Sequence, residues 1–213
     1  KVKQFIYASS GSVYGIKDEE HVTEDLDLVP ISVYNKTKMV SERVLMSYQD
    51  DFKVHCIRPA TVCGWSPRMR LDVSVNMFTW QALKNNEMTV YGGKQVRPNI
   101  NIQDMVKVYE HFLENDDINS GFYNAGFENI SILSIAEMIK DKLGGTKITI
   151  TESNDPRSYR QNSDKLLQTG FKQEFDVGNA IDEIISIYNK GNLDEGDNCF
   201  TVKWMKHLNL DQY

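Results

Sequence analysis

Two short apolar runs flank one helical pattern, and this arrangement constrains the fold more than any other feature of the chain. Residues 5–9 (Phe-Ile-Tyr-Ala-Ser) and 54–57 (Val-His-Cys-Ile) are β-prone and lack regular polar alternation, as strands covered on both faces of a parallel sheet do. Between them, Ser32 can cap a helix in which Val40 and Val44 recur at helical spacing. Because a strand, a helix and a strand in this order make neighbouring strands parallel, we expect an α/β fold.

Further segments continue this alternation along the chain of 213 residues. Periodicity predicts helices at 74–84, 104–113, 132–143 and 177–188, and strands at 88–91, 121–125 and 147–151. Residues 192–213 show weak periodicity and are expected to be a partly ordered tail or an oligomer contact.

Composition excludes several classes of function. The net charge of −6 comes from mixed charges without a basic run, so nucleic acid is not an expected partner. Cys56, Cys63 and Cys199 are scattered, so neither a metal site nor a disulfide framework is expected, and the cysteines are interpreted as small core residues of a cytoplasmic protein. No stretch approaches the roughly 20 apolar residues of a membrane span, and nothing resembles a signal peptide.

Tyr34 and Lys38 stand four residues apart, so a helix places their side chains next to each other on one face. A free phenol loses its proton only at about pH 10, but a nearby ammonium favours the phenolate in a cleft that water screens poorly. Such a phenol can take a proton from a substrate hydroxyl. Ser9 or Ser10, at the end of the preceding strand, is placed to hydrogen-bond the same hydroxyl, because sites gather at the carboxyl ends of parallel strands.

Chance alone gives roughly one Tyr-x-x-x-Lys pair in a chain of this composition, so the neighbouring motifs decide what the pair means. Residues 9–15 (Ser-Ser-Gly-Ser-Val-Tyr-Gly) end the first strand, and residues 57–64 (Ile-Arg-Pro-Ala-Thr-Val-Cys-Gly) end the next one. In this order and at these intervals, the motifs resemble the extended short-chain dehydrogenase/reductase family, in particular its nucleotide-sugar epimerases and dehydratases. The resemblance covers nearly the whole chain.

This resemblance implies the carboxyl-terminal half of a Rossmann-type parallel sheet plus a smaller mixed α/β substrate-binding domain. Residues 1–64, with 93–125 returning to them, would form the dinucleotide-binding part, and 65–92 with 126–213 the substrate-binding part. The family's Gly-x-x-Gly-x-x-Gly turn, which receives the pyrophosphate, is not in the chain. About four strand–helix units, or roughly a hundred residues, are therefore expected before Lys1, either in the same longer enzyme or in a separate chain.

The resemblance also implies roles for residues at the strand ends. Tyr34 corresponds to the catalytic acid/base, and Lys38 to the residue that holds the nicotinamide ribose and tunes the tyrosine. Ser10 corresponds to the serine that contacts the substrate hydroxyl. Pro59 would line the nicotinamide side by its backbone, with Ser9 also on the cofactor side. The implied cofactor is NAD, with NADP as the alternative because the segment that distinguishes them is absent.

Three more residues correspond to contacts with a nucleotide-diphosphate sugar. Asn76 matches a position that approaches the diphosphate, and Arg97 matches the arginine of a family stretch that ends at Asp104. Arg157 is expected to be the second phosphate clamp, since guanidinium forks match phosphate oxygens in pairs. Asp104 itself is interpreted as a helix cap rather than a ligand contact.

The same motifs limit which reactions of the family are expected. Family dehydratases carry an extra acid and base at the positions of Gly11 and Ser12, and neither residue titrates near neutral pH. With dehydration disfavoured, the expected reaction is hydride transfer at a single carbon. Tyr34 would take the hydroxyl proton while a ketosugar forms. We expect an epimerase, with the 4-epimerases the nearest in pattern and a ketoreductase or a 4,6-dehydratase as alternatives.

Departures from the family pattern at Cys63, Pro98 and Asn101 leave the identity of the sugar open. An alternative of another class is a catalytically silent protein that binds sugar nucleotides. Surface-polysaccharide synthesis is the expected setting. Family members often pair through the helix that carries the tyrosine, so a homodimer is expected.

Overall fold

The computed structural model describes residues 2–153, 158 and 160–210 of the chain. It divides into two compact units, which are described separately below. Unit 1 comprises Lys1–Val62, Gln95–Ile130 and Pro156–Glu174, and unit 2 comprises Cys63–Lys94, Ser131–Asp155 and Phe175–Tyr213. The first boundary lies close to the one expected at residue 64. In contrast, residues 160–174 belong to unit 1 and not to the smaller domain in which the sequence analysis placed them.

Unit 1 contains a three-stranded parallel sheet in the order β1-β2-β6. Its strands are β1 (Gln4–Ala8), β2 (Lys53–Pro59) and β6 (Gly121–Ala125). Both β1 and β6 run parallel to β2. The 3₁₀ helix η1 (Gly11–Tyr14) and the helix α1 (Val33–Met46) connect β1 to β2, and the Ser32 side chain caps α1 by accepting from the Asn35 backbone. The expected strand–helix–strand connection is confirmed.

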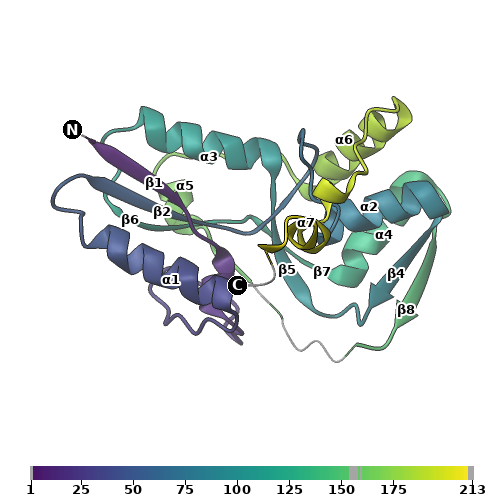
Figure 1. Ribbon diagram of the computed structural model, residues 1–213, viewed down its shortest axis with the longest axis horizontal. Helices are drawn as coiled ribbons and strands as arrows, with labels where there is room; N and C mark the ends of the chain where they lie inside the picture. The colour runs from purple at the N-terminus through teal and green to yellow at the C-terminus, as the bar shows by residue number, and fades with distance from the viewer. Residues whose placement is uncertain (1, 154–157, 159, 211–213) are drawn as a thin grey trace. The chain divides into compact units, whose positions relative to one another are not determined.

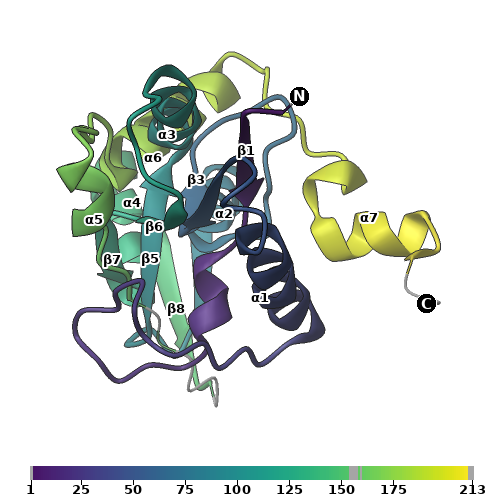
Figure 2. The same ribbon diagram turned by 90° about the vertical axis from the view of Figure 1, so that its left-hand side faces the viewer.

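Helices α1 and α3 (Ile102–Glu114) lie on opposite faces of this sheet (Figures 1 and 2). Side chains alternate along β2, so neighbouring residues meet different helices. Ile57 shares a buried apolar cluster with Phe112 of α3, whereas Arg58 pairs with Glu42 of α1. One face of the sheet is therefore an ordinary apolar core, and the other holds a buried charge pair.

One expectation about burial is wrong. β1 is an edge strand of the sheet as described, so Phe5 is 42% exposed instead of covered on both faces. α1 buries the polar Asn35 and Glu42, while Val40 and Val44 are exposed. The helical period of α1 was predicted correctly, but its apolar residues do not face the sheet, because a charged residue of β2 lies on that side.

Three strands that the sequence pattern does not predict make a second small sheet in the order β3-β5-β7. They are β3 (Thr61–Cys63), β5 (Val96–Asn101) and β7 (Glu128–Ser131). The short helix α5 (Asp164–Gln168) was also missed. Asn101 caps α3, so Asp104 is not the cap; its buried carboxylate instead accepts from the Glu174 backbone.

Unit 2 contains a two-stranded parallel sheet and most of the remaining helices. Its elements are α2 (Ser74–Asn85), β4 (Glu87–Tyr91), α4 (Ile132–Leu143), β8 (Lys147–Thr151), α6 (Val177–Asn189), η2 (Asp197–Cys199) and α7 (Thr201–His207). α2 packs against both α4 and α6, and β4 pairs with β8. The region expected to be a tail contributes to this unit, because Cys199 joins Met69, Leu71 and Ile184 in a buried cluster. No helix of the described residues has the length and apolarity that crossing a bilayer requires.

His55 is a buried histidine in β2, and its protonation should affect stability. Its Nδ1 accepts from Gln4 Nε2 at 3.1 Å and its Nε2 donates to the Ile118 carbonyl at 3.2 Å, so the neutral ring is fully bonded. Burial lowers the pKa of His55 from its ordinary value of 6.5. As the pH falls through 6.5, the unfolded chain binds a proton that the folded protein does not, so the free energy of unfolding should fall.

The slope from this one proton is at most about 1.4 kcal/mol per pH unit. Urea denaturation between pH 7.5 and pH 5 should show the fall in the wild type and a shallower slope in His55→Gln. Equal slopes in the two proteins would contradict this assignment.

Candidate functional site

Residues 9–15, which follow β1 and include η1, form a segment called the Ser10 loop below. Ser10 caps η1, since its Oγ accepts from the Ser12 backbone at 3.2 Å. Its Oγ also lies 2.7 Å from Ser12 Oγ, which in turn donates to Asn35 Oδ1 of α1 at 2.8 Å. A chain of hydrogen bonds therefore joins the Ser10 hydroxyl to the first turn of the helix that carries Tyr34.

Tyr34 and Lys38 lie on α1 as the spacing predicted. Lys38 Nζ lies 5.7 Å from the centre of the Tyr34 ring and 4.9 Å from that of Tyr7. The same ammonium donates to the Ala8 carbonyl at 2.7 Å, so it is held at the carboxyl end of β1. The Tyr34 side chain is 56% exposed and is therefore open to a bound molecule.

Ser9 and Pro59 end neighbouring strands at the same edge of the sheet. The Ser9 backbone donates to the Ile57 carbonyl at 2.8 Å, which joins the end of β1 to β2. The Ser9 side chain is 3% exposed, and its Oγ has no hydrogen-bond partner among the described residues. Pro59 is the last residue of β2 and lies opposite Ala125 of β6. A buried hydroxyl without a partner at this edge is what a site completed by a bound group leaves.

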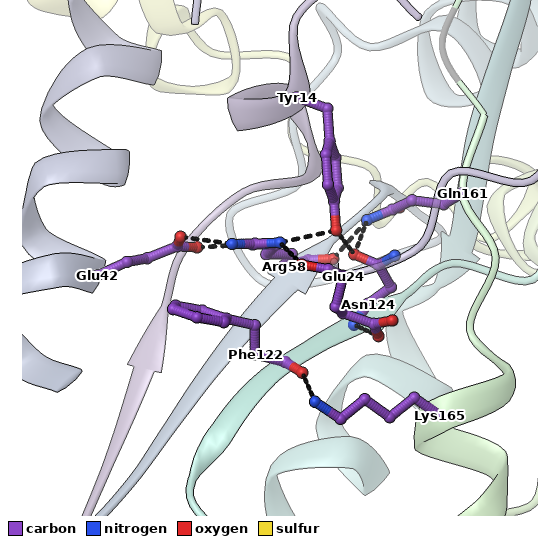
Figure 3. A network of polar contacts seen from close by, with 8 residues as sticks. All are labelled: Tyr14, Glu24, Glu42, Arg58, Phe122, Asn124, Gln161 and Lys165. Atoms are coloured by element: carbon purple, nitrogen blue, oxygen red, sulfur yellow. Dashed lines mark hydrogen bonds and ion pairs between the residues drawn. The ribbon is translucent and has the colours of Figure 1, made fainter. Parts of the chain in front are cut away.

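A buried polar network lies behind these residues (Figure 3). Arg58 donates from Nε and Nη2 to the two carboxylate oxygens of Glu42, at 2.9 and 2.8 Å. Arg58 Nη1 donates to Tyr14 Oη at 2.8 Å, and Tyr14 donates to Asn124 Oδ1 at 2.8 Å. Burial raises the pKa of Tyr14 to about 12 against the opposing effect of the Arg58 charge, so the phenol stays protonated and can donate.

Gln161 extends the network toward the Ser10 loop. Its Nε2 donates to the Arg58 carbonyl at 2.8 Å and to Asn124 Oδ1 at 3.2 Å. A Cβ atom on Gly11 would lie 2.5 Å from this Nε2. Gln161 therefore occupies the space that any side chain at position 11 would need.

The expected substrate-binding residues lie in different units: Asn76 in unit 2 and Arg97 in unit 1. Asn76 is buried in α2 and uses its amide within unit 2, accepting from the Gly64 backbone and donating to the Arg70 carbonyl, both at 3.0 Å. Arg97 is half-buried in β5, and its Nη1 donates to the Val96 carbonyl at 3.0 Å. Arg157 lies outside the described residues. The roles of all three toward a diphosphate stay predictions.

Two hollows of about 400 Å³ each lie within unit 1, away from Tyr34. His21, Asn162 and Asp164 line both of them. Over the ranges that the structure describes, no group of three or more His, Cys, Asp or Glu residues could hold a metal ion. The cysteines are buried, as core residues are.

Gly15 ends η1 in a backbone conformation that only glycine adopts easily, with φ 72° and ψ −153°. A Cβ atom there would lie 2.0 Å from the Val29 carbonyl oxygen. Gly144 has φ 70°, but a Cβ atom there would meet nothing within 4 Å. In urea denaturation, Gly144→Ala should lower the free energy of unfolding by about 1–2 kcal/mol, and Gly15→Ala by about 2–4 kcal/mol. Equal losses would show that the close approach to Val29 has no effect.

Known proteins resemble this chain in sequence and in fold. The sequence profile of the NAD dependent epimerase/dehydratase family matches residues 1–126. An uncharacterized UDP-glucose epimerase, YtcB, of Bacillus subtilis is 30% identical over 155 residues, which are 70% of this chain and 47% of that protein. A dTDP-D-glucose 4,6-dehydratase of Dictyostelium discoideum is 28% identical over 152 residues, which are 65% of this chain and 35% of that protein. The chain thus spans about half the length of these curated relatives, or less.

Among solved structures, a UDP-glucuronic acid 4-epimerase variant from Bacillus cereus has a similar fold. It was solved in complex with UDP-4-deoxy-4-fluoro-glucuronic acid and NAD, and it is 27% identical with a TM-score of 0.76 over 88% of this chain and 62% of that one. The α/β fold is therefore of the Rossmann type found in nucleotide-sugar epimerases. With more than half of its residues matched by the family profile, this chain belongs to the NAD dependent epimerase/dehydratase family.

Proposed function

We propose that the protein is a nucleotide-sugar epimerase that acts by oxidation and reduction at a single sugar carbon. One observation carries the proposal: the Lys38 ammonium is fixed by the Ala8 carbonyl at the end of β1 and lies 5.7 Å from the ring of the half-exposed Tyr34. A phenol next to a fixed cation, open to a bound molecule, is suited to exchange a proton with a hydroxyl.

The residues of this set have different tasks. Tyr34 Oη takes the proton from the sugar hydroxyl and returns it when the alcohol re-forms. Lys38 stabilises the negative charge on that oxygen and offers further N–H donors to a ribose. The Ser10 hydroxyl, linked through Ser12 to Asn35, orients the substrate hydroxyl toward Tyr34.

The residues at the strand ends fit a nicotinamide dinucleotide, which the family and the Bacillus cereus structure suggest. The unpartnered buried Ser9 Oγ and the backbone at Pro59 would hold its nicotinamide side, next to Lys38. When bound, it supplies the reversible acceptance and return of hydride that converts an alcohol to a ketone and back. NAD is the proposed form, and NADP the alternative.

The Ser10 loop disfavours dehydration. Removing water across two carbons requires a further acid and base, and positions 11 and 12 hold Gly and Ser. An aspartate at position 11 would have to displace Gln161, whose side chain is buried and hydrogen-bonded to Arg58 and Asn124. Ser12 is occupied by its bonds to Ser10 and Asn35.

The proposed substrate is a nucleotide-diphosphate sugar, as the names of the relatives suggest. Arg97, Arg157 and Asn76 are the proposed diphosphate contacts, because arginine forks pair with phosphate oxygens. The complete gene product should be incubated with UDP-glucose, UDP-glucuronic acid and dTDP-glucose, and the products analysed by mass and chromatography. A product of unchanged mass and different retention supports epimerisation. Loss of 18 mass units would indicate dehydration, loss of two with added NAD would indicate oxidation to a ketosugar, the reverse of a ketoreductase, and binding without conversion would indicate a silent protein.

We also propose a homodimer that pairs through α1. Four large apolar or aromatic side chains on α1 or just beyond its end are about half exposed or more: Val33, Val40, Val44 and Tyr48. Burying such a face in a symmetric contact removes apolar surface from water. Analytical ultracentrifugation of the complete gene product should give twice the subunit mass, and Val40→Glu with Val44→Glu should give the subunit mass. A wild-type monomer would contradict the proposal.

A further inference from the structure

Arg58 is 1% exposed and is the largest fully buried side chain of the described residues, yet it takes no part in the proposed proton transfer. We propose that Arg58 is a positioning residue: it fixes the helix that carries Tyr34 and the loop that carries Ser10 in one relative placement at the end of β2. The inference rests on the proposed function, because it explains how residues of three elements are kept ready for one substrate hydroxyl.

Arg58 contacts helix α1 through a bidentate pair of hydrogen bonds to Glu42. Both carboxylate oxygens of Glu42 accept from Arg58, at 2.9 and 2.8 Å, and the paired side chains are 1–2% exposed. Glu42 follows Tyr34 by two turns and Lys38 by one, so all three project from one face of α1. Two parallel hydrogen bonds fix the roll of the helix as well as its distance from β2, which a single bond cannot do.

The contact with the loop is made through Tyr14. Arg58 Nη1 donates to Tyr14 Oη, which donates to Asn124 of β6. Tyr14 is the last residue of η1, and this short helix begins directly after Ser10. The placement of the Ser10 hydroxyl therefore depends on the same guanidinium that holds α1.

Ring contacts keep the guanidinium itself in place. Its central carbon lies 4.9 Å from the centre of the Tyr14 ring and 4.5 Å from that of Phe122. Figure 3 shows Arg58 with Glu42 on one side and Tyr14 on the other. A planar, delocalised cation suits these ring faces and the fork together, and a lysine ammonium does not. Pro59 follows Arg58 directly, so the cofactor side of the site is tied to the same residue.

Loss of this placement should act on turnover more than on binding. A displacement of about 1 Å in a reacting group can cost 10²-fold in rate, whereas the proposed diphosphate contacts, which would set affinity, are other residues of the chain. In the complete gene product, Arg58→Lys should lower kcat about 10²-fold and Tyr14→Phe about ten-fold, with KM and bound cofactor within about three-fold of wild type.

The control is Val108→Ala, which opens a cavity on the α3 face of the same unit, where Val108 is fully buried. It should lower the melting temperature while its kcat per folded molecule, measured well below the melting transition, stays at the wild-type value. If Arg58→Lys and Tyr14→Phe also keep the wild-type kcat at that temperature, Arg58 has a structural role only and the inference is overturned.

Amide hydrogen exchange separates this inference from the proposed function. Arg58→Lys should speed exchange in residues 33–46 and in residues 11–14 together, and leave β4 and β8 of unit 2 unchanged. A wild type without turnover would refute the proposed function, and the exchange result would then still decide the inference. If either segment keeps its wild-type protection in Arg58→Lys, Arg58 does not couple the helix to the loop.

Discussion

Tyr34→Phe is expected to lower kcat for interconversion of the nucleotide sugar by about 10²–10⁴-fold, the range that a positioned acid/base contributes. The substitution removes only the phenol oxygen, so the side chain keeps its helical position and its ring near Lys38. Binding of the nucleotide sugar should change little, because that oxygen acts on the proton that moves during the reaction. Steady-state kinetics and equilibrium binding of the same variant measure the two effects separately.

Tyr48→Phe is the matched control. Tyr48 is half-exposed just beyond the end of α1 and stacks on Phe52, with ring centres 5.9 Å apart. Loss of its hydroxyl should leave turnover unchanged. Wild-type turnover in Tyr34→Phe would refute the role assigned to Tyr34.

Glu42→Leu is expected to lower the free energy of unfolding by about 3–5 kcal/mol, because it leaves the Arg58 charge buried without its carboxylate. Water cannot reach a guanidinium that is 1% exposed, so the lost Coulomb attraction is not replaced by hydration. Urea denaturation measures the loss. The double variant Glu42→Leu with Arg58→Met should recover most of it, since no charge then remains buried.

Glu87→Leu provides the comparison for an exposed pair. Glu87 Oε1 lies 2.8 Å from Lys147 Nζ, the same length as the buried pair, but the side chains are 41% and 70% exposed. Because solvent screens such a pair, its removal should leave the free energy of unfolding nearly unchanged. A loss of this small size in Glu42→Leu would mean that Arg58 stays solvated or finds another partner.

Local patterns predicted the placement of Tyr34 and Lys38 on one helix well. The spacing of Tyr34 and Lys38 is fixed by the helical turn, and Ser32 marks the start of α1, so both follow from a few neighbouring residues. Which side of α1 packs on the sheet does not follow from neighbouring residues. Periodicity shows that Val40 and Val44 share a face, but only the fold shows that Arg58 attracts the Glu42 face to the sheet instead.

The network behind the site was beyond sequence reasoning because its partners are far apart in the chain. Tyr14 and Asn124 are separated by 110 residues, and Arg58 and Gln161 by 103. Strand β5 was missed for a related reason. It contains Pro98, Asn99 and Asn101, all three of which are buried. Asn99 Nδ2 donates to the Arg97 carbonyl at 2.8 Å and Asn101 caps α3, so these two side chains have hydrogen bonds inside the fold.

The most direct test of the epimerase proposal is the fate of the hydrogen on the reacting carbon. A nucleotide sugar that carries deuterium on that carbon should be incubated with the complete gene product in ordinary water, and the unlabelled sugar should be incubated in heavy water. Oxidation and reduction at one carbon predict that both epimers keep the original deuterium and that none enters from the solvent. Loss of the label, or deuterium gained from heavy water on a neighbouring carbon, would contradict the account.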